Sequence, residues 1–528
     1  MRRQGRRLYR LAKGALLILF ALRSLRYVFF GQLYLDEGAY LQAARLAYAG
    51  MIPYRDFLHV HPPLVPYIYG IPQLLFGRSI LVGRLTSLAL GLGTLLLGSS
   101  LTSRLCGDMA SVIALALLAV TDRVNWIFSV TKTEPLVTFF SVASLHALCC
   151  LRREPARSLV AVACLIMAAG TRISCLPAAA AALALGLYRN RNNHLHILLL
   201  LGVSTLMLAL LFGVFLLMAP EQTIFNIYTF QRYRDLQWGN PVVLSPVEWI
   251  CTRVYLIGIH LSSVYPAALQ VLLPLVPFTL FSARERLSRE LLACLALMLV
   301  LALLLYCPNL LAPNRILPTY MTPSFVIMAL FFGCAVGAHY RTLEGTVAAR
   351  LLMFLALSVV CTQALTGLQS DTARLDTVSP QLETLREVAR FVASNTTPEE
   401  QVVTFDTYIA VEADRKVALG LDRNFFSYFP YLSDEEARKY RVVNDNLLAE
   451  AILDERTAFV LFTDYDIRLI TEKEERLEQP DRPLSDDELF SLLPVLKGEY
   501  ALVRVVPDFG QWHDNLYVFA RKRLAISD

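Results

Sequence analysis

The chain has 528 residues, 55% of them hydrophobic, and a mean hydropathy of +0.49, which excludes an ordinary soluble enzyme and indicates a polytopic membrane protein. Its net charge of +5 conceals an asymmetry, because residues 1–370 carry 30 Lys and Arg against 13 Asp and Glu, whereas residues 371–528 carry 19 against 31. We therefore expect a membrane domain over 1–370 and a soluble domain over 371–528. The acidic balance of the second domain argues against binding to nucleic acid.

Apolar segments follow one another through the first 370 residues. A helix needs about 20 residues to cross the hydrocarbon core, and fewer when neighbours shield its ends. The first segment lacks a signal-peptide cleavage site and is interrupted by Arg23 and Arg26, so we interpret it as a retained helix. The sequence predicts eleven transmembrane helices, near residues 13–33, 79–101, 108–122, 134–151, 157–173, 174–188, 195–219, 252–281, 290–307, 316–337 and 348–367.

The first external loop, residues 34–78, has a different character. Residues 62–76 contain four Pro and one Gly, which makes a full transmembrane helix improbable there. We expect a short helix in the outer interface instead, and a second amphipathic helix over residues 39–49.

Basic residues fix the expected orientation. They gather in alternate short loops, such as residues 152–157, 189–191, 284–289 and 341–350, which are therefore predicted to be cytoplasmic. With a cytoplasmic N-terminus and an odd number of helices, residues 34–78 and 371–528 lie outside. We expect a multi-pass protein of the inner (cytoplasmic) membrane with an extracytoplasmic C-terminal domain.

The C-terminal domain is predicted to be α/β. Ser379-Pro380 favours a helix start, and Ser433 with Glu436 resembles a capping box. Four short apolar runs predict strands at residues 402–405, 459–462, 501–503 and 516–519. The expected fold is thus mainly α, with interfacial helices in the first external loop and a soluble α/β domain at the end.

An acid pair, Asp36-Glu37, opens the first external loop. Two adjacent acids can simply favour the N-terminus of a helix that begins near Gly38. Carboxylates beside a bilayer are costly, however, and by default indicate a functional site. Further polar residues follow in the same loop and strengthen that interpretation: Tyr54, Arg55, Asp56, His59 and His61.

Other candidates lie along the same external level. His59 and His61 alternate and could hold a divalent metal ion with Asp36 or Asp56, although hydrogen bonding to substrate or backbone is the preferred interpretation. Glu134 lies at the outer end of a predicted helix, where it could serve only the helix dipole. Three arginines at outer helix ends either anchor helices or grip an anionic headgroup: Arg84, Arg172 and Arg315.

Four motifs carry a resemblance to a known family: residues 36–40 (DEGAY), residues 50–57 (GMIPYRDF), residues 61–64 (HPPL), and Phe76-Gly77 followed by Arg84. In these residues the sequence resembles the GT-C type polytopic membrane glycosyltransferases, family 39-like. These include protein O-mannosyltransferases, the lipid A aminoarabinose transferase and bacterial relatives that act on lipopolysaccharide. Glu134 and residues 314–318 extend the resemblance more weakly to about residue 370.

The resemblance implies an inverting transfer of a sugar from a polyprenyl-phosphate donor to a glycan, lipid or protein acceptor outside the membrane, with no metal or only a loosely assisting one. Asp36 is the implied base, which takes the proton of the acceptor hydroxyl. Glu37 supports it or binds sugar hydroxyls. The remaining roles are phosphate binding by His61, Arg84, Arg172 or Arg315, donor or acceptor binding by Glu134, stacking by Tyr54, and substrate contacts from Asp56 and His59.

Two departures leave the acceptor open. His61 stands where the aminoarabinose transferase has a Lys that contacts the donor phosphate. The protein mannosyltransferases also have His there, but their large luminal insertion is missing. The main alternative function is a secondary transporter with a periplasmic cap, although charges at the outer edge fit it less well than charges at the midplane would. A membrane scaffold is a further alternative, but it leaves residues 36–70 unexplained.

Overall fold

The structure, a computed structural model, divides the chain into two compact units. It describes residues 2–230, 246–259, 265, 287–311, 318–343, 346–371, 375, 380–471 and 483–524. The first unit combines Met1–Tyr27, Ser87–Gly213 and Gly239–Arg374, and the second combines Val28–Thr86, Val214–Trp238 and Leu375–Asp528. The first external loop therefore belongs to the same compact unit as the C-terminal segment. The domain boundary between residues 370 and 371 stays a prediction.

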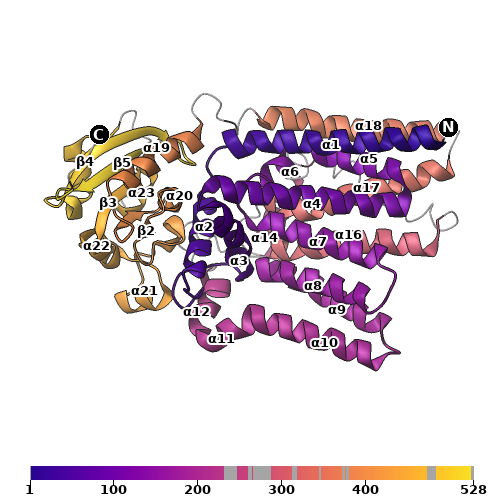
Figure 1. The fold of residues 1–528 in the computed structure, drawn as a ribbon, viewed down its shortest axis with the longest axis horizontal. Coiled ribbons are helices and arrows are strands. Elements are labelled where there is room, and N and C mark those ends of the chain that lie inside the picture. The colour runs from indigo at the N-terminus through magenta and orange to yellow at the C-terminus, as the bar shows by residue number, and fades with distance from the viewer. Residues whose placement is uncertain are drawn as a thin grey trace. The chain divides into compact units, whose positions relative to one another are not determined.

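Helices build the first unit (Figure 1). Within the described residues, six helices are long and apolar enough to cross a membrane, and four shorter apolar helices accompany them. The protein is thus a mainly helical multi-pass membrane protein, whereas the number of eleven spans stays a prediction. Part of the predicted span 252–281 lies outside the described residues. The helices are α1 (Arg2–Phe30), α4 (Ile80–Cys106), α5 (Asp108–Val120), α6 (Asp122–Ile127), α7 (Thr133–Cys150), α8 (Ala156–Thr171), α9 (Leu176–Arg189), α10 (His194–Leu208), α14 (Pro246–Ile259), α16 (Arg289–Leu311), α17 (Thr322–Thr342) and α18 (Val347–Asp371).

Helix α17 is largely buried inside the first unit, and small residues let it approach α5. A Cβ atom on Gly333 would lie 2.4 Å from the carbonyl oxygen of Ala110, and one on Gly337 would lie 2.7 Å from the Cβ of Ala110. Small residues at such crossings allow backbones to pack closely where lipid provides no hydrophobic drive. The α5–α17 contact is therefore set by steric fit.

The second unit contains a five-stranded sheet with the order β2-β1-β3-β5-β4. β1 (Gln401–Thr404) pairs in parallel with β2 (Lys416–Val417) and β3 (Thr457–Thr463), whereas β5 (Asp514–Arg521) runs antiparallel to both β3 and β4 (Tyr500–Phe509). Every residue of β3 is buried, as expected of a central strand covered on both faces. The four predicted strands are present, and the two-residue β2 was too short to predict.

Short helices complete the second unit: α2 (Leu35–Tyr48), α3 (Leu64–Phe76), α11 (Val214–Met218), α12 (Pro220–Ile224), α19 (Gln381–Ser394), α20 (Thr407–Glu412), α21 (Asp434–Tyr440), α22 (Asp445–Leu453), α23 (Asp464–Thr471) and α24 (Asp486–Leu492). Helices α2 and α3 confirm the two helices predicted in the first external loop. α21 begins with the predicted capping box of Ser433 and Glu436. Helix α3, with 13 residues and an internal Pro72, is too short to span a bilayer unaided.

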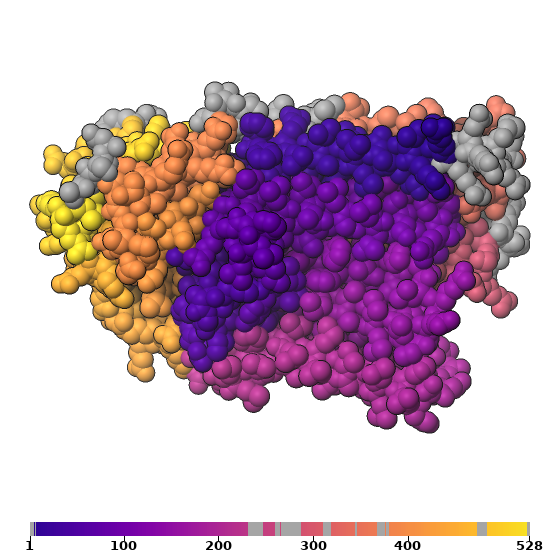
Figure 2. Space-filling view, viewed as in Figure 1, coloured from indigo at the N-terminus to yellow at the C-terminus, as the bar shows by residue number. Residues whose placement is uncertain are grey.

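Helix α2 packs directly against the C-terminal segment of the same unit, where α20 lies beside it (Figures 1 and 2). A Cβ on Gly38 would lie 2.3 Å from the backbone nitrogen of Tyr408 and 2.7 Å from Oγ1 of Thr407. At the start of α2, the backbone N–H of Leu35 donates to Gln511 Oε1 at 2.9 Å. Arg78, near the end of the loop, forms an ion pair with Asp414 at 2.7 Å. The acid pair thus lies on a helix that the C-terminal segment holds in place.

The first prediction concerns Gly38. Replacing Gly38 by Ala should lower stability by about 1–3 kcal/mol, because the new Cβ meets backbone atoms that have little freedom to move away. Thermal unfolding in detergent, followed by intrinsic fluorescence, measures this change. Gly202→Ala is the control, since nothing lies within 4 Å of the Cβ it would add. Equal melting temperatures for the two variants would contradict a tight contact at α2.

Candidate active site

Glu37 and Arg84 form a buried ion pair at the start of α2. Arg84 donates from Nε to Oε1 of Glu37 at 3.0 Å and from Nη2 to Oε2 at 2.8 Å, in the two-pronged geometry that guanidinium and carboxylate favour. The side chain of Arg84 is 0% exposed and that of Glu37 is 1% exposed. Oε2 of Glu37 also accepts the backbone N–H of Tyr34 at 3.2 Å, which caps the helix.

The remaining donors of Arg84 are engaged as well. Nη1 donates to the carbonyl oxygens of Val28 and Gly31 at 3.0 and 3.1 Å, and Nη2 donates to that of Gln32 at 3.1 Å. A guanidinium carries five N–H groups, and five bonds to protein oxygens account for all of them. Phosphate binding by Arg84 would therefore require some of these bonds to break, and the geometry favours a structural role. Arg84 joins the end of α1, the start of α2 and α4 at one point.

Asp36, next to Glu37, points to a different partner. Its Oδ1 lies 3.0 Å from Nη2 of Arg423, and its side chain is 21% exposed, whereas that of Arg423 is 4% exposed. The guanidinium of Arg423 also lies over the ring of Tyr40, 4.5 Å from its centroid, in cation–π geometry. Asp36 and Tyr40 are four residues apart on α2, so one face of the helix presents both. Of the two acids, only Asp36 is accessible.

The two histidines lie near this cluster. The ring of His61 is 5.7 Å from that of Tyr40 and 6.5 Å from that of His59. His59 is buried, and its backbone N–H donates to Asn226 Oδ1 at 2.8 Å. Burial, together with the nearby charge of Arg423, lowers the pKa of His59 to about 3, so its ring is neutral at physiological pH. His59 can offer hydrogen bonds but no positive charge.

Tyr54 and Asp56 help to shape the loop. Tyr54 is fully buried, with a left-handed φ of 71°, and its hydroxyl donates to the carbonyl oxygen of His61 at 2.7 Å. A sugar can reach its ring only if neighbouring side chains move. Asp56 accepts two hydrogen bonds from Arg55 and one from the backbone of Ile52, each at 2.8 Å, and Arg55 holds the pKa of Asp56 below its usual value. Their contacts with substrate stay predictions.

Glu134 and Arg172, in the first unit, pair with each other. Arg172 Nη1 lies 3.1 Å from Oε1 of Glu134, whose side chain is 1% exposed, and Thr133 Oγ1 donates to Oε2 at 3.2 Å. The guanidinium of Arg172 lies over the ring of Tyr320, 3.7 Å from its centroid. The first turn of α7 and the end of α8 thus bring together two residues that the sequence indicated separately. Arg315 lies outside the described residues.

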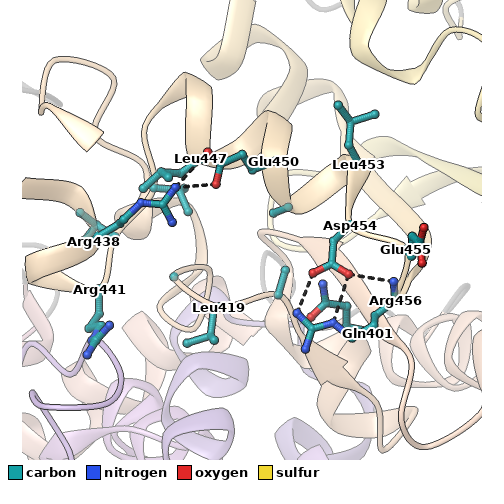
Figure 3. Close-up of a pocket in the computed structure, with 15 residues that line it drawn as sticks. Gln401, Leu419, Arg438, Arg441, Leu447, Glu450, Leu453, Asp454, Glu455 and Arg456 are labelled. Carbon is teal, nitrogen blue, oxygen red and sulfur yellow. Dashed lines mark hydrogen bonds and ion pairs between the residues drawn. The ribbon is translucent and has the colours of Figure 1, made fainter. Parts of the chain in front are cut away.

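The part of the chain that the structure describes contains no group of three or more His, Cys, Asp or Glu arranged to hold a metal ion. A cavity of about 920 Å³ opens in the C-terminal segment, between β1, α21 and α22 (Figure 3). Its walls carry the ion pairs Arg438–Glu450 and Arg456–Asp454, each at 2.6 Å. None of the predicted site residues lines it.

Sequence reasoning missed Arg423, Tyr40 and Asn226 as members of the cluster. A signal for Arg423 was present, since Asp422-Arg423 interrupts an otherwise apolar run that continues into Phe425-Phe426. A buried charge in such a run needs a partner, but nothing in the run itself points to Asp36, 387 residues earlier.

The described fold is similar to that of two solved structures of ArnT, which supports the resemblance at the level of the fold alone. The structure is similar to ArnT from Cupriavidus metallidurans in the apo state, with a TM-score of 0.60 and 13% identity over 98% of each chain. It is equally similar to ArnT bound to undecaprenyl phosphate, with a TM-score of 0.60 and 13% identity over 96% of this chain and 97% of that chain.

A third solved structure, the oligosaccharyltransferase of Archaeoglobus fulgidus in complex with Zn and sulfate, has a TM-score of 0.49 and 13% identity over 96% of this chain and 73% of that chain. No family model matches the sequence, and no curated protein matches it.

The second prediction tests the buried arginine. Arg84→Lys should cost about 3–5 kcal/mol of stability, because an ammonium cannot replace the planar fork and leaves buried oxygens without donors. Arg78→Lys is the matched control, since Arg78 is more exposed and its pair with Asp414 should contribute less than about 1 kcal/mol. Melting temperatures of the two variants give the comparison. A loss at Arg84 no greater than that at Arg78 would contradict the structural role.

The third prediction concerns Asp422, whose Oδ1 accepts from Gln42 Nε2 of α2 at 3.4 Å. Burial raises the pKa of this carboxyl from 3.8 to about 6. Between these values the folded state binds the proton more tightly than the unfolded state does, so stability falls as pH rises through this window. Asp422→Asn removes this penalty and keeps the oxygen that faces Gln42.

The Asp422→Asn variant should therefore be more stable than the wild type by about 1–3 kcal/mol at about pH 7.5, but not at about pH 4. Melting temperatures at both pH values provide the measurement. Asp487→Asn, at an exposed position on α24, should shift the melting temperature little at either pH. The same gain for Asp422→Asn at both values would show that its ionisation is not the cause.

Proposed function

We propose that this protein is a glycosyltransferase that moves a sugar from a polyprenyl-phosphate donor to an acceptor on the outer face of the cytoplasmic membrane. Asp36 is the base of an inverting reaction. The observation that carries the proposal is the division between the two adjacent acids: Glu37 is buried and held by Arg84, whereas Asp36 is partly exposed and faces the Arg423–Tyr40 cluster. Glu37 thereby fixes the backbone from which Asp36 reaches the acceptor.

The chemistry follows from the groups in this cluster. The Asp36 carboxylate takes the proton of an acceptor hydroxyl while the hydroxyl oxygen forms a bond to the anomeric carbon of the sugar. The bond between that carbon and the donor phosphate oxygen breaks, and the polyprenyl phosphate leaves as an anion, so a general acid is not required. Cationic side chains that hold the phosphate stabilise the charge that it gains.

Support for the donor class comes from ArnT, which has the same fold and was solved with undecaprenyl phosphate. His61, Arg172 and Arg315 are the proposed phosphate contacts, whereas Arg84 acts through Glu37. Glu134 is the proposed donor or acceptor contact, with Arg172 as its neighbour. The acceptor is a glycan, a lipid or a protein. The proposed topology keeps eleven spans, a cytoplasmic N-terminus and an extracytoplasmic C-terminal segment.

The fourth prediction tests the base. Asp36→Asn should lower the transfer rate about 10²–10⁴-fold, because amide nitrogen and oxygen cannot take the proton, while the protein still folds and still binds carrier lipid. The assay first identifies lipids that co-purify in mild detergent by mass spectrometry. It then follows conversion of the sugar-loaded carrier to polyprenyl phosphate when cell-envelope extract is added as the source of acceptor.

Asp487→Asn, with its side chain in solvent far along the sequence, should retain wild-type turnover. Undiminished transfer by Asp36→Asn would refute the assignment of the base. Solute flux in proteoliposomes without any sugar transfer would instead support the transporter alternative.

A further inference from the structure

Arg423 contributes to the cluster from the C-terminal segment. It precedes the short helix η6 (Asn424–Ser427), and its backbone N–H donates to Ser427 Oγ at 2.9 Å. Asp422, the residue before it, contacts Gln42 of α2, as described above. The contacts of Ser427 and Asp422 thus fix the backbone that carries Arg423. The Arg423 side chain is oriented towards the face of α2 that bears Asp36.

The guanidinium of Arg423 is only partly satisfied. Nη2 contacts Asp36 at 3.0 Å, whereas Nε and Nη1 are buried and have no hydrogen-bond partner among the described residues. Leaving buried donors of a charged group unsatisfied costs free energy, and buried donors are normally paired unless they serve a ligand. Arg423 thus has donors that the described residues leave unpaired, unlike Arg84, whose five N–H groups all donate to protein oxygens.

The surroundings of Arg423 select the kind of ligand. Tyr40 covers one face of the guanidinium and orients its plane. The N–H groups of Nε and Nη1, unpaired within the described part of the chain, point outward from different edges of the planar guanidinium, so each can donate to an oxygen of an anion such as phosphate. Asp36, the carboxylate that already contacts the guanidinium, is the proposed base. An anion bound at Nε or Nη1 would therefore lie within one side chain of this carboxylate.

We propose that Arg423 binds the phosphate of the lipid-linked donor through guanidinium N–H groups that the described residues leave unpaired, while Nη2 positions the carboxylate of Asp36. The C-terminal segment would thereby supply a donor-binding residue of the active site. This inference rests on the proposed function, since it assumes a phosphate-linked donor and Asp36 as the base. The alternative is an ion pair that only attaches α2 to the C-terminal segment.

Binding measurements on the full chain in nanodiscs distinguish phosphate binding by Arg423 from an ion pair that only attaches α2. The probes are undecaprenyl phosphate, undecaprenol, which lacks the phosphate, and inorganic phosphate, which lacks the lipid. Arg423→Gln should weaken undecaprenyl phosphate binding ~10-fold or more, because charge-assisted hydrogen bonds are lost, and should leave undecaprenol binding unchanged. Arg423→Lys, which keeps the charge but loses the fork, should be intermediate.

Arg441→Gln is the matched control. Arg441 also connects the C-terminal segment to the first external loop, since its Nε donates to the carbonyl oxygen of Arg55 at 2.9 Å, and the carboxylate that its charge influences is Asp56, not Asp36. Its loss should leave undecaprenyl phosphate binding at the wild-type value. Equal weakening by Arg423→Gln and Arg441→Gln would overturn the proposal in favour of simple attachment.

Asp36→Asn provides a test that leaves Arg423 intact. Removing the competing carboxylate charge should tighten undecaprenyl phosphate binding several-fold, whereas an Arg423 that never contacts phosphate predicts no change. If Arg423→Gln does not fold, this variant and Arg423→Lys still decide the outcome. Binding of inorganic phosphate but not of the lipid would overturn the lipid-headgroup assignment.

The two proposals fail in different ways. A wild-type protein that binds no undecaprenyl phosphate and transfers no sugar contradicts both. A wild-type protein that binds the lipid and loses transfer in Asp36→Asn, yet binds it equally well in Arg423→Gln, contradicts only the role of Arg423.

Discussion

The buried ion pair between Glu37 and Arg84 is the interaction on which the described site depends. Two charges removed from water are stabilising only when their geometry is good and their remaining hydrogen bonds are satisfied. Here Arg84 reaches that condition by donating to three backbone carbonyls as well as to both oxygens of Glu37. The pair therefore determines where α2 begins, and with it the position of Asp36.

Adjacent acids with opposite surroundings can divide structural and chemical tasks. A carboxylate that is fully paired and buried holds its position but cannot exchange its partner for a substrate. The side chain of Asp36 is 21% exposed beside Arg423, so a substrate hydroxyl can approach it. The paired and buried Glu37 directly next to Asp36, the proposed base, gives the Asp36 carboxylate a fixed position in the backbone without burying it.

Sequence reasoning succeeded where the signal was local. Composition predicted a polytopic helical protein, alternation and apolar runs predicted four of the five strands, and the motif around Asp36 led to a fold that the ArnT structures share. The residues alone could not separate the roles of Asp36 and Glu37, which only the family resemblance distinguished, because both are acids at a helix start and their partners lie far away in the chain. Phosphate binding was predicted for Arg84 for the same reason. The five oxygens that accept its hydrogen bonds come from α1, α2 and the turn between them, which the sequence around Arg84 does not indicate.

The C-terminal segment shows why long-range partners matter for function as well as for fold. The acidic composition of residues 371–528 predicted a separate soluble domain. In the structure, however, the first external loop and this segment belong to one compact unit. Gly38 has no room for a Cβ against α20, and Arg78 pairs with Asp414. The loop and the segment are therefore complementary in both shape and charge at this contact. Because the same contact places Arg423 beside Asp36, a change in the C-terminal segment would alter the site's charge without touching any membrane helix. In the proposed role of Arg423, this segment contributes a side chain to the active site.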